Sequence, residues 1–264
     1  MKLPIYQVDA FTNQTFKGNA AAVVPLLEGW LSDAQMQAIA LENNLSETAF
    51  LVREADGAFH IRWFSPMTEI DFCGHATLAS AFVLLEQGLA AAPLTFRAAA
   101  VGDIQVHRQD DGLLEMNFPN RAPERVDNPP VELLQGLGEA PQAVLRNRQA
   151  WFAVYEHEGQ VRQLAPDLAA LKALAPLDVV VPAPGVEHDF VSRYFWPANG
   201  GDEDPVTGSI HAGLAPYWSE RLGKTRLWAH QASRRGGELY CRVEGERVHV
   251  AGHAVLYLQG SIQI

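Results

Sequence analysis

Residues 69–82 read EIDFCGHATLASAF, and this stretch decides the expected fold. Gly74 provides a tight turn, and the small and apolar residues that follow continue as far as Gly88, so the stretch predicts a buried helix that begins at Gly74. The first turn of a helix has backbone N–H groups without intrahelical partners and carries the positive end of the helix dipole. We therefore expect this helix start to favour a bound anion.

A second stretch of the same kind reads DPVTGSIHAGL at residues 204–214. Gly208 and Ser209 again precede small residues, which predicts a second buried helix from Gly208 to about Gly223. Pro216 lies inside that helix, where it removes one backbone hydrogen bond and is expected to produce a kink.

The second half of the sequence repeats the order of the first half. RWFSP at residues 62–66 returns as RYFWP at 193–197, and LSD at 31–33 has its counterpart in APD at 165–167. Repetition in order, together with two similar long helices, predicts an α+β fold with two similar domains, each a curled β-sheet around a central helix. We assign residues 1–118 and 131–264 to the two domains and the Pro-rich residues 119–130 to a linker, with terminal strands that can cross over. Such halves are expected to pack about a pseudo-twofold axis with an active site in the cleft between them.

The composition is that of a soluble globular protein, because 48% of the 264 residues are hydrophobic and 19% are charged. A formal net charge of −11 argues against nucleic acid or an anionic membrane as a partner. No apolar run is long enough to span a bilayer and the N-terminal residues are typical of a strand, so we expect a cytoplasmic protein. Its two cysteines are expected to be free thiols.

Local patterns place one acidic residue at a junction between two elements. Ser32 and Gln35 form a capping-box pattern that predicts a helix ending near residues 43–44. The next segment, residues 47–52, is strand-like, so Glu47 lies at the junction between the predicted helix and this strand. Its apolar neighbours would favour the neutral carboxyl group, which suits a residue that takes and gives a proton in turn. The alternative is that Glu47 only caps the strand or forms an ion pair.

Four other polar residues border the two predicted helix starts, and each has a structural alternative. His75 can donate to a substrate oxygen or cap its helix, and Asp204, held extended by the proline that follows, can face the cleft or solvent. Ser209 is a helix cap or a substrate contact, and Cys73 is a thiol base or an inert buried thiol. We find no nucleotide-binding loop, metal-ligand spacing or nucleophile elbow, which predicts chemistry without a metal or cofactor.

Five motifs together resemble the phenazine biosynthesis PhzF-like family over essentially the full length. They are VDAFT at 8–12, FKGN at 16–19, NLSETAF at 44–50, GHATL at 74–78 and DPVTGS at 204–209. The resemblance implies the diaminopimelate epimerase-like fold, a homodimer and no cofactor. In the characterised phenazine enzyme of this family, a glutamate moves a proton on a dihydro-hydroxyanthranilate and isomerises it.

The resemblance also implies roles for residues of this chain. Glu47 matches the proton-shuttling glutamate, and His75 and Asp204 match its polar helpers. The substrate, expected to be a small carboxylate, would be bound by the residues around the two helix starts together with one from the second motif, namely Cys73, Gly74, Thr207, Gly208, Ser209 and Asn19.

Related cofactor-independent epimerases use two thiols, one before each glycine turn. Cys73 occupies the first place in this chain, but the second is Thr207, whose hydroxyl is far too weak an acid to act as a thiol does. This favours isomerisation by a single carboxyl group. Two alternatives stay open: a racemase or epimerase that depends on Cys73, and a non-catalytic small-ligand binding protein that retains the cleft.

Overall fold

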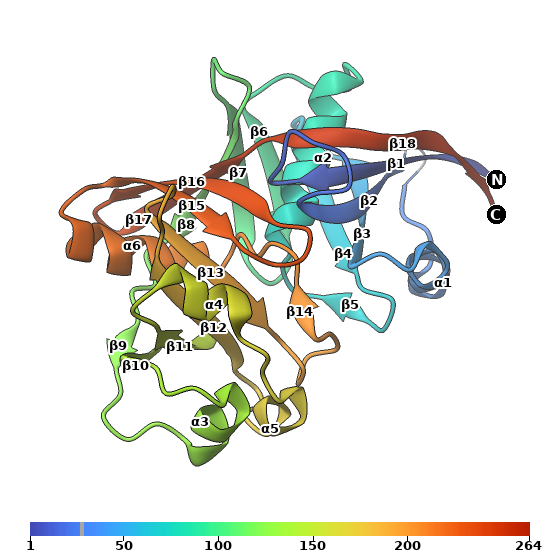
Figure 1. Ribbon diagram of the computed structural model, residues 1–264. Helices are drawn as coiled ribbons and strands as arrows, with labels where there is room; N and C mark the ends of the chain where they lie inside the picture. The colour runs from blue at the N-terminus through green and yellow to red at the C-terminus, as the bar shows by residue number, and fades with distance from the viewer. Residues whose placement is uncertain (27–28) are drawn as a thin grey trace. The chain divides into compact units, whose positions relative to one another are not determined.

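The computed structural model of the chain describes residues 1–26 and 29–264 and divides into two compact units (Figure 1). Unit 1 comprises Met1–Asn117 and Ala251–Ile264, and unit 2 comprises Phe118–Val250. Both units combine strands with helices, as the predicted α+β class requires.

The elements of unit 1 are β1 (Lys2–Ala10), β2 (Asn19–Leu26), α1 (Asp33–Asn43), β3 (Glu47–Arg53), β4 (Phe59–Phe64), β5 (Glu69–Ile70), α2 (Gly74–Glu86), β6 (Leu94–Ala98), β7 (Gly102–Arg108), β8 (Leu114–Pro119) and β18 (Ala254–Gln263). Those of unit 2 are β9 (Glu124–Arg125), α3 (Val131–Leu137), β10 (Ala143–Arg146), β11 (Ala150–Val154), α4 (Glu158–Gln163), α5 (Leu168–Lys172), β12 (Asp178–Pro184), β13 (Phe190–Phe195), β14 (Glu203–Asp204), α6 (His211–Leu222), β15 (Arg226–Gln231), β16 (Gly237–Glu244) and β17 (Arg247–Gly252). The boundary between the units falls within β8 and within β17.

Helix α2 is the buried centre of unit 1. It contacts β1, β2, β3 and β18, and Figure 1 shows it behind the ribbon of β1 and β18. Ten of its thirteen residues are buried, mostly small ones such as Ala76 and Ala79, because a helix covered on nearly every side has no room for bulky side chains. The predicted helix start at Gly74 and the short helix capped by Ser32 and Gln35 are both confirmed.

The strand pairings of unit 1 recur in unit 2 in the same order. β2 and β3 are parallel, β3 and β4 antiparallel, and β4 is parallel to β6. In unit 2, β11 and β12 are parallel, β12 and β13 antiparallel, and β13 is parallel to β15. In both units, the long helix lies in the connection between the last parallel pair. The repeat seen in the sequence is therefore a repeat of topology.

The repeated arginines make the same ion pair in both units. Arg62 on β4 donates to both carboxylate oxygens of Glu69 on β5, at 2.7 and 2.6 Å. Arg193 on β13 donates in the same way to Glu203 on β14, at 2.7 and 3.0 Å. Each pair joins a long strand to the two-residue strand that leads toward the long helix. The turn before each helix is thereby fixed from one side.

Helix α6 begins at His211, three residues later than the sequence predicts. Residues 208–210 form a turn closed by i→i+3 bonds, in which the N–H groups of His211 and Ala212 donate to Gly208 and Ser209. This tighter turn satisfies the backbone without an α-helical start. The end of the helix, with Gly223 in a left-handed conformation at φ 67°, agrees with the prediction.

Pro216 lies inside α6, and the bond that it removes is replaced from outside the helix. The carbonyl of Ala212, four residues earlier, accepts a 3.0 Å hydrogen bond from the backbone N–H of Arg121. Residues 119–130, predicted as the linker, lie in unit 2, where β9 pairs with β10. Among the described residues, no helix combines the length and apolar character needed to cross a bilayer.

Candidate active site

Glu47 lies at the first position of β3 and is buried, with 6% of its surface exposed. Helix α1 ends at Asn43, and Asn44 in a left-handed conformation turns the chain into β3. Parallel pairing with β2 then sets Glu47 opposite Ala21. The carboxyl group is thus held by two adjoining elements in the interior of unit 1.

His75, the second residue of α2, is the nearest polar neighbour of that carboxyl group. Its Nε2 lies 3.0 Å from Oε2 of Glu47, and both side chains are more than nine-tenths buried. The contact is close but lacks hydrogen-bond geometry, and Oε2 accepts no hydrogen bond from the described residues. A buried carboxylate oxygen without a donor is unusual and characteristic of functional sites.

Asn19 determines which nitrogen of His75 carries the proton. The Asn19 side-chain amide lies 3.2 Å from Nδ1 of His75, and its oxygen accepts a 3.3 Å hydrogen bond from Ser46. With its oxygen occupied by the hydroxyl, the amide presents its N–H group to Nδ1. The imidazole proton is therefore placed on Nε2, beside Glu47.

Cys73 completes the buried group in unit 1. Its Sγ lies 3.4 Å from Nδ1 of His75, and neither it nor Cys241 forms a disulfide. The donor atoms of Glu47, Cys73 and His75 all lie within 4.8 Å of one another, so these three residues could hold a metal ion. Carboxylate, thiolate and imidazole are the ligands that zinc accepts. The expectation of chemistry without a metal stays a prediction.

The second predicted group of residues lies in unit 2 and is organised by Gln231, which the sequence analysis missed. Gln231 is completely buried. Its amide donates to the Asp204 carbonyl at 2.9 Å, and its oxygen accepts the backbone N–H of Thr207 at 2.9 Å. The Thr207 hydroxyl donates to the Asp204 carboxylate at 2.5 Å. Gln231, more than twenty residues later in the sequence, thus fixes the turn at Asp204 and Thr207 that precedes α6.

Ser209 lies at the end of a second series of hydrogen-bonded side chains in unit 2. Gln149 donates to the Ser209 hydroxyl at 2.9 Å and to the Tyr194 hydroxyl at 3.2 Å, and Tyr194 donates to Asp178 at 2.5 Å. Burial raises the pKa of Asp178, while hydrogen bonds from Tyr194 and Asn199 lower it. Asp178 is the first residue of β12, and Glu47 is the first residue of β3. Asp178 follows Glu47 by 131 residues in the sequence. The repeat offset between Arg62 and Arg193 is the signal that could have found it.

The predicted site residues therefore form two groups. Unit 1 brings together Glu47, His75, Cys73, Gly74 and Asn19, and unit 2 brings together Asp204, Thr207, Gly208 and Ser209. Gly74 and Gly208 are both buried beside the start of a long helix.

The fold of the chain is similar to that of a known epimerase. The crystal structure of a hydroxyproline epimerase from Agrobacterium vitis aligns with a TM-score of 0.63, covering 99% of this chain and 92% of that chain. At 11% identity the likeness concerns the fold alone. The chain is an α+β protein of the epimerase-like fold class, as predicted.

The comparisons also identify the family. The family model for phenazine biosynthesis-like proteins matches residues 8–260. Two uncharacterized isomerases of Pseudomonas aeruginosa are 49% and 50% identical, each comparison covering 100% of both chains. A phenazine biosynthesis protein of the PhzF family from Enterococcus faecalis, known from a crystal structure, is 45% identical with a TM-score of 0.94, again covering 100% of both chains. The chain belongs to the phenazine biosynthesis-like family, and it is an isomerase. The predicted family and enzyme class are confirmed.

Proposed function

We propose that the chain is a cofactor-independent isomerase of a small carboxylate, in which Glu47 moves a proton from one carbon of the substrate to another. One observation carries the proposal: Oε2 of Glu47 is buried, lies 3.0 Å from His75, and accepts no hydrogen bond from the described residues. A carboxylate oxygen in that state is available to a substrate C–H group.

In the proposed reaction, a C–H bond of the substrate breaks and its proton passes to Glu47, while the electron pair stays in the substrate. Glu47 then returns the proton to a different carbon, so no oxidant or reductant is needed. The Nε2–H group of His75 would stabilise the carboxylate form and orient it. Asn19 would act as a positioning residue, because it holds His75 in the required tautomer.

The residues of unit 2 enter the proposal through the sequence resemblance. We assign Asp204, Gly208 and Ser209 to binding of the substrate. Because the Ser209 hydroxyl already accepts a hydrogen bond from Gln149, its own O–H group is left to donate to a substrate oxygen. The same resemblance carries the proposals that the chain is a homodimer and works without a cofactor, which sedimentation and dialysis against a chelator test.

The decisive variant is Glu47→Gln. A panel of small carboxylates that includes a dihydro-hydroxyanthranilate is incubated with the protein in D2O, and NMR follows deuterium uptake at carbon. The variant should bind the active compound with an unchanged Kd but lose exchange and turnover by at least about a thousandfold, since the amide cannot carry the proton. Glu42→Gln, on the exposed face of α1, is the matched control and should retain the wild-type rate. Exchange in Glu47→Gln at the wild-type rate would overturn the proposal.

A racemase that depends on Cys73 is the second candidate, favoured by the position of its thiol 3.4 Å from His75. In that case Cys73→Ser would abolish exchange at the carbon that changes configuration. Under the main proposal, Cys73→Ser retains turnover within about tenfold, because the thiol carries no proton of the reaction. Measuring both variants on the same compound separates the two candidates.

A further inference from the structure

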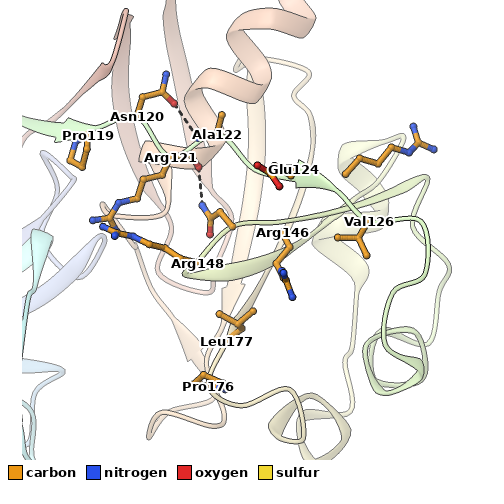
Figure 2. A pocket seen from close by; sticks show the side chains of 12 residues that line it. Pro119, Asn120, Arg121, Ala122, Glu124, Val126, Arg146, Arg148, Pro176 and Leu177 are labelled. Carbon is orange, nitrogen blue, oxygen red and sulfur yellow. Dashed lines mark hydrogen bonds between the residues drawn. The ribbon is translucent and has the colours of Figure 1, made fainter.

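A pocket of about 890 Å³ lies within unit 2, and none of the residues that line it is assigned to the active site (Figure 2). Residues 119–122, 124–126, 146–148 and 176–177 line it. Its charged lining consists of Arg121, Arg125, Arg146, Arg148 and Glu124. The whole chain carries a formal net charge of −11, so the pocket is opposite in sign to the molecule that contains it.

Arg121 shows that this positive charge is not balanced inside the protein. Its Nε is buried and has no hydrogen-bond partner among the described residues. Burial lowers the pKa of Arg121, and the positive charge of Arg148 lowers it further. Figure 2 shows the two side chains extending in the same direction from neighbouring segments. An anion between the two guanidinium groups would accept hydrogen bonds from both and offset their mutual repulsion.

The other arginines are also open to a ligand. Arg146 lies over the ring of Trp151, 5.4 Å from its centre, and no described carboxylate forms an ion pair with Arg146 or Arg148. Arg125 has only a loose contact of 3.7 Å with Asp127, and both of those side chains are more than three-quarters exposed. The guanidinium groups of these three arginines therefore remain available to a ligand.

The backbone that carries these arginines is fixed before any ligand arrives. The N–H group of Arg121 donates to Ala212, the carbonyl left open by Pro216, and the Arg121 carbonyl accepts from Asn147 at 3.0 Å. β9 pairs with β10, which sets Arg125 opposite Leu145. A preorganised site loses less entropy on binding than a mobile surface does.

We propose that this pocket binds a small molecule that carries at least two phosphate groups. A guanidinium group makes two parallel hydrogen bonds to one phosphate, and each phosphate brings up to two negative charges. Figure 2 shows the side chains of Arg121 and Arg148 close together and that of Arg146 separate from them, so a single small ion would meet only part of the charge. The volume is also that of a site for a nucleotide-sized molecule, not for one ion.

Isothermal titration calorimetry of the full chain tests the proposal with four probes: sodium tripolyphosphate, ATP without Mg²⁺, adenosine and citrate. Tripolyphosphate and ATP should bind, whereas adenosine should not, and citrate should bind at least about tenfold more weakly despite its three carboxylates. Tighter binding of ATP than of tripolyphosphate would show that the site takes a nucleotide. Equal binding would show that it takes the phosphate chain alone.

The double variant Arg121→Gln with Arg148→Gln should raise the Kd for tripolyphosphate at least about tenfold. Arg226→Gln, at an exposed position of unit 2 outside the pocket, should change it by less than about twofold. If the double variant does not fold, the single change Arg146→Gln gives the same comparison. An unchanged Kd in the pocket variants, absence of binding at millimolar tripolyphosphate, or equal binding of citrate would each overturn the proposal.

Discussion

At the residue scale, Asn19 is the side chain on which the proposed chemistry most depends besides Glu47 itself. It places the imidazole proton on Nε2 through its contact with Nδ1 of His75. A carboxylate at position 19 would accept a hydrogen bond from an Nδ1–H group, so the proton would lie on Nδ1 and a lone pair on Nε2 would face the Glu47 carboxylate. We expect Asn19→Asp to lower kcat for exchange by about 10²–10⁴, the scale of effect seen when a catalytic imidazole is held in the wrong tautomer.

Two measurements distinguish this effect from a loss of folding. Nitrogen-15 NMR of labelled histidine should show Nε2–H in the wild type and Nδ1–H in Asn19→Asp. Asn19→Ala, which leaves the tautomer free, should lose only about tenfold in kcat. Wild-type kcat in Asn19→Asp, or the same tautomer in both proteins, would contradict the role assigned to Asn19.

His211 makes the stability of unit 2 depend on pH. Burial lowers its pKa to about 4, because Nε2 is buried without a partner among the described residues, while Nδ1 contacts the Thr207 carbonyl at 2.9 Å. The unfolded chain, with a histidine pKa of about 6.5, takes up the proton first as the pH falls. This contribution to stability is therefore complete above pH 6.5 and is lost between pH 6.5 and 4.

We expect the wild type to lose about 2 kcal/mol of unfolding free energy from this group between pH 7 and pH 5. His211→Asn keeps a side-chain donor for the Thr207 carbonyl but has no group that titrates in this range. The variant should be less stable at pH 7 because it leaves a cavity, yet its loss between pH 7 and 5 should be smaller than that of the wild type by about 2 kcal/mol. Urea titrations at both pH values measure the difference, and parallel losses in the two proteins would refute it.

The role of a single residue is best predicted from the sequence where neighbouring residues mark the end of a helix or a turn. Glu47 and His75 stand out because they border a predicted helix end and a glycine turn. Gln231 and Gln149 do not, since their partners are distant in the sequence and only the folded sheet brings them together. A buried amide gives no periodic signal, so its role appears only with the structure.

At the scale of elements, Arg193 connects β13 to β14 and to the end of α4. Besides its two bonds to Glu203, it donates to the Leu164 carbonyl at 2.7 Å and to the Val161 carbonyl at 3.2 Å. Its side chain is only 14% exposed. Removing it would leave a carboxylate and two carbonyls without their donor.

Arg193→Met should therefore lower the unfolding free energy by about 2–3 kcal/mol in urea denaturation. Arg226→Met, at an exposed site in the same unit, is the matched control and should change it by less than about 0.5 kcal/mol. A loss in Arg193→Met no larger than that of the control would show that the repeated ion pair contributes nothing to stability.

Elements were predictable where their ends are marked by capping residues. The pattern of Ser32 and Gln35 fixes the start of α1, and Asn44 fixes its end. The start of α6 was placed three residues early because a glycine and a serine allow a helix start without requiring one, and hydrogen bonds of the i→i+3 type take over residues 208–210. The short helices α3 and α4 were not predicted, since their seven and six residues give too little periodicity to recognise.

At the scale of the whole molecule, the last strand of the chain completes the first unit. β18 pairs antiparallel with β1 along its length, from Lys2 opposite Gln263 to Ala10 opposite Ala254, although all of unit 2 lies between them in the sequence. It also contacts α2, the buried centre of unit 1. Unit 1 therefore closes only after all of unit 2 and then β18 have been synthesised, which makes it dependent on long-range pairing.

Deleting residues 254–264 should destabilise unit 1 selectively, because β1 would lose the partner on one side and α2 part of its cover. Hydrogen–deuterium exchange with mass spectrometry should show amide protection falling at least about a hundredfold in β1 and α2, while β12 and β13 in unit 2 keep theirs. Deleting only residues 263–264 removes the end of the β1–β18 pairing and should leave the amide protection of both units unchanged. Equal loss of protection in β12 and β1 would mean that the two units unfold as one body, and unchanged protection in β1 would mean that β18 is dispensable.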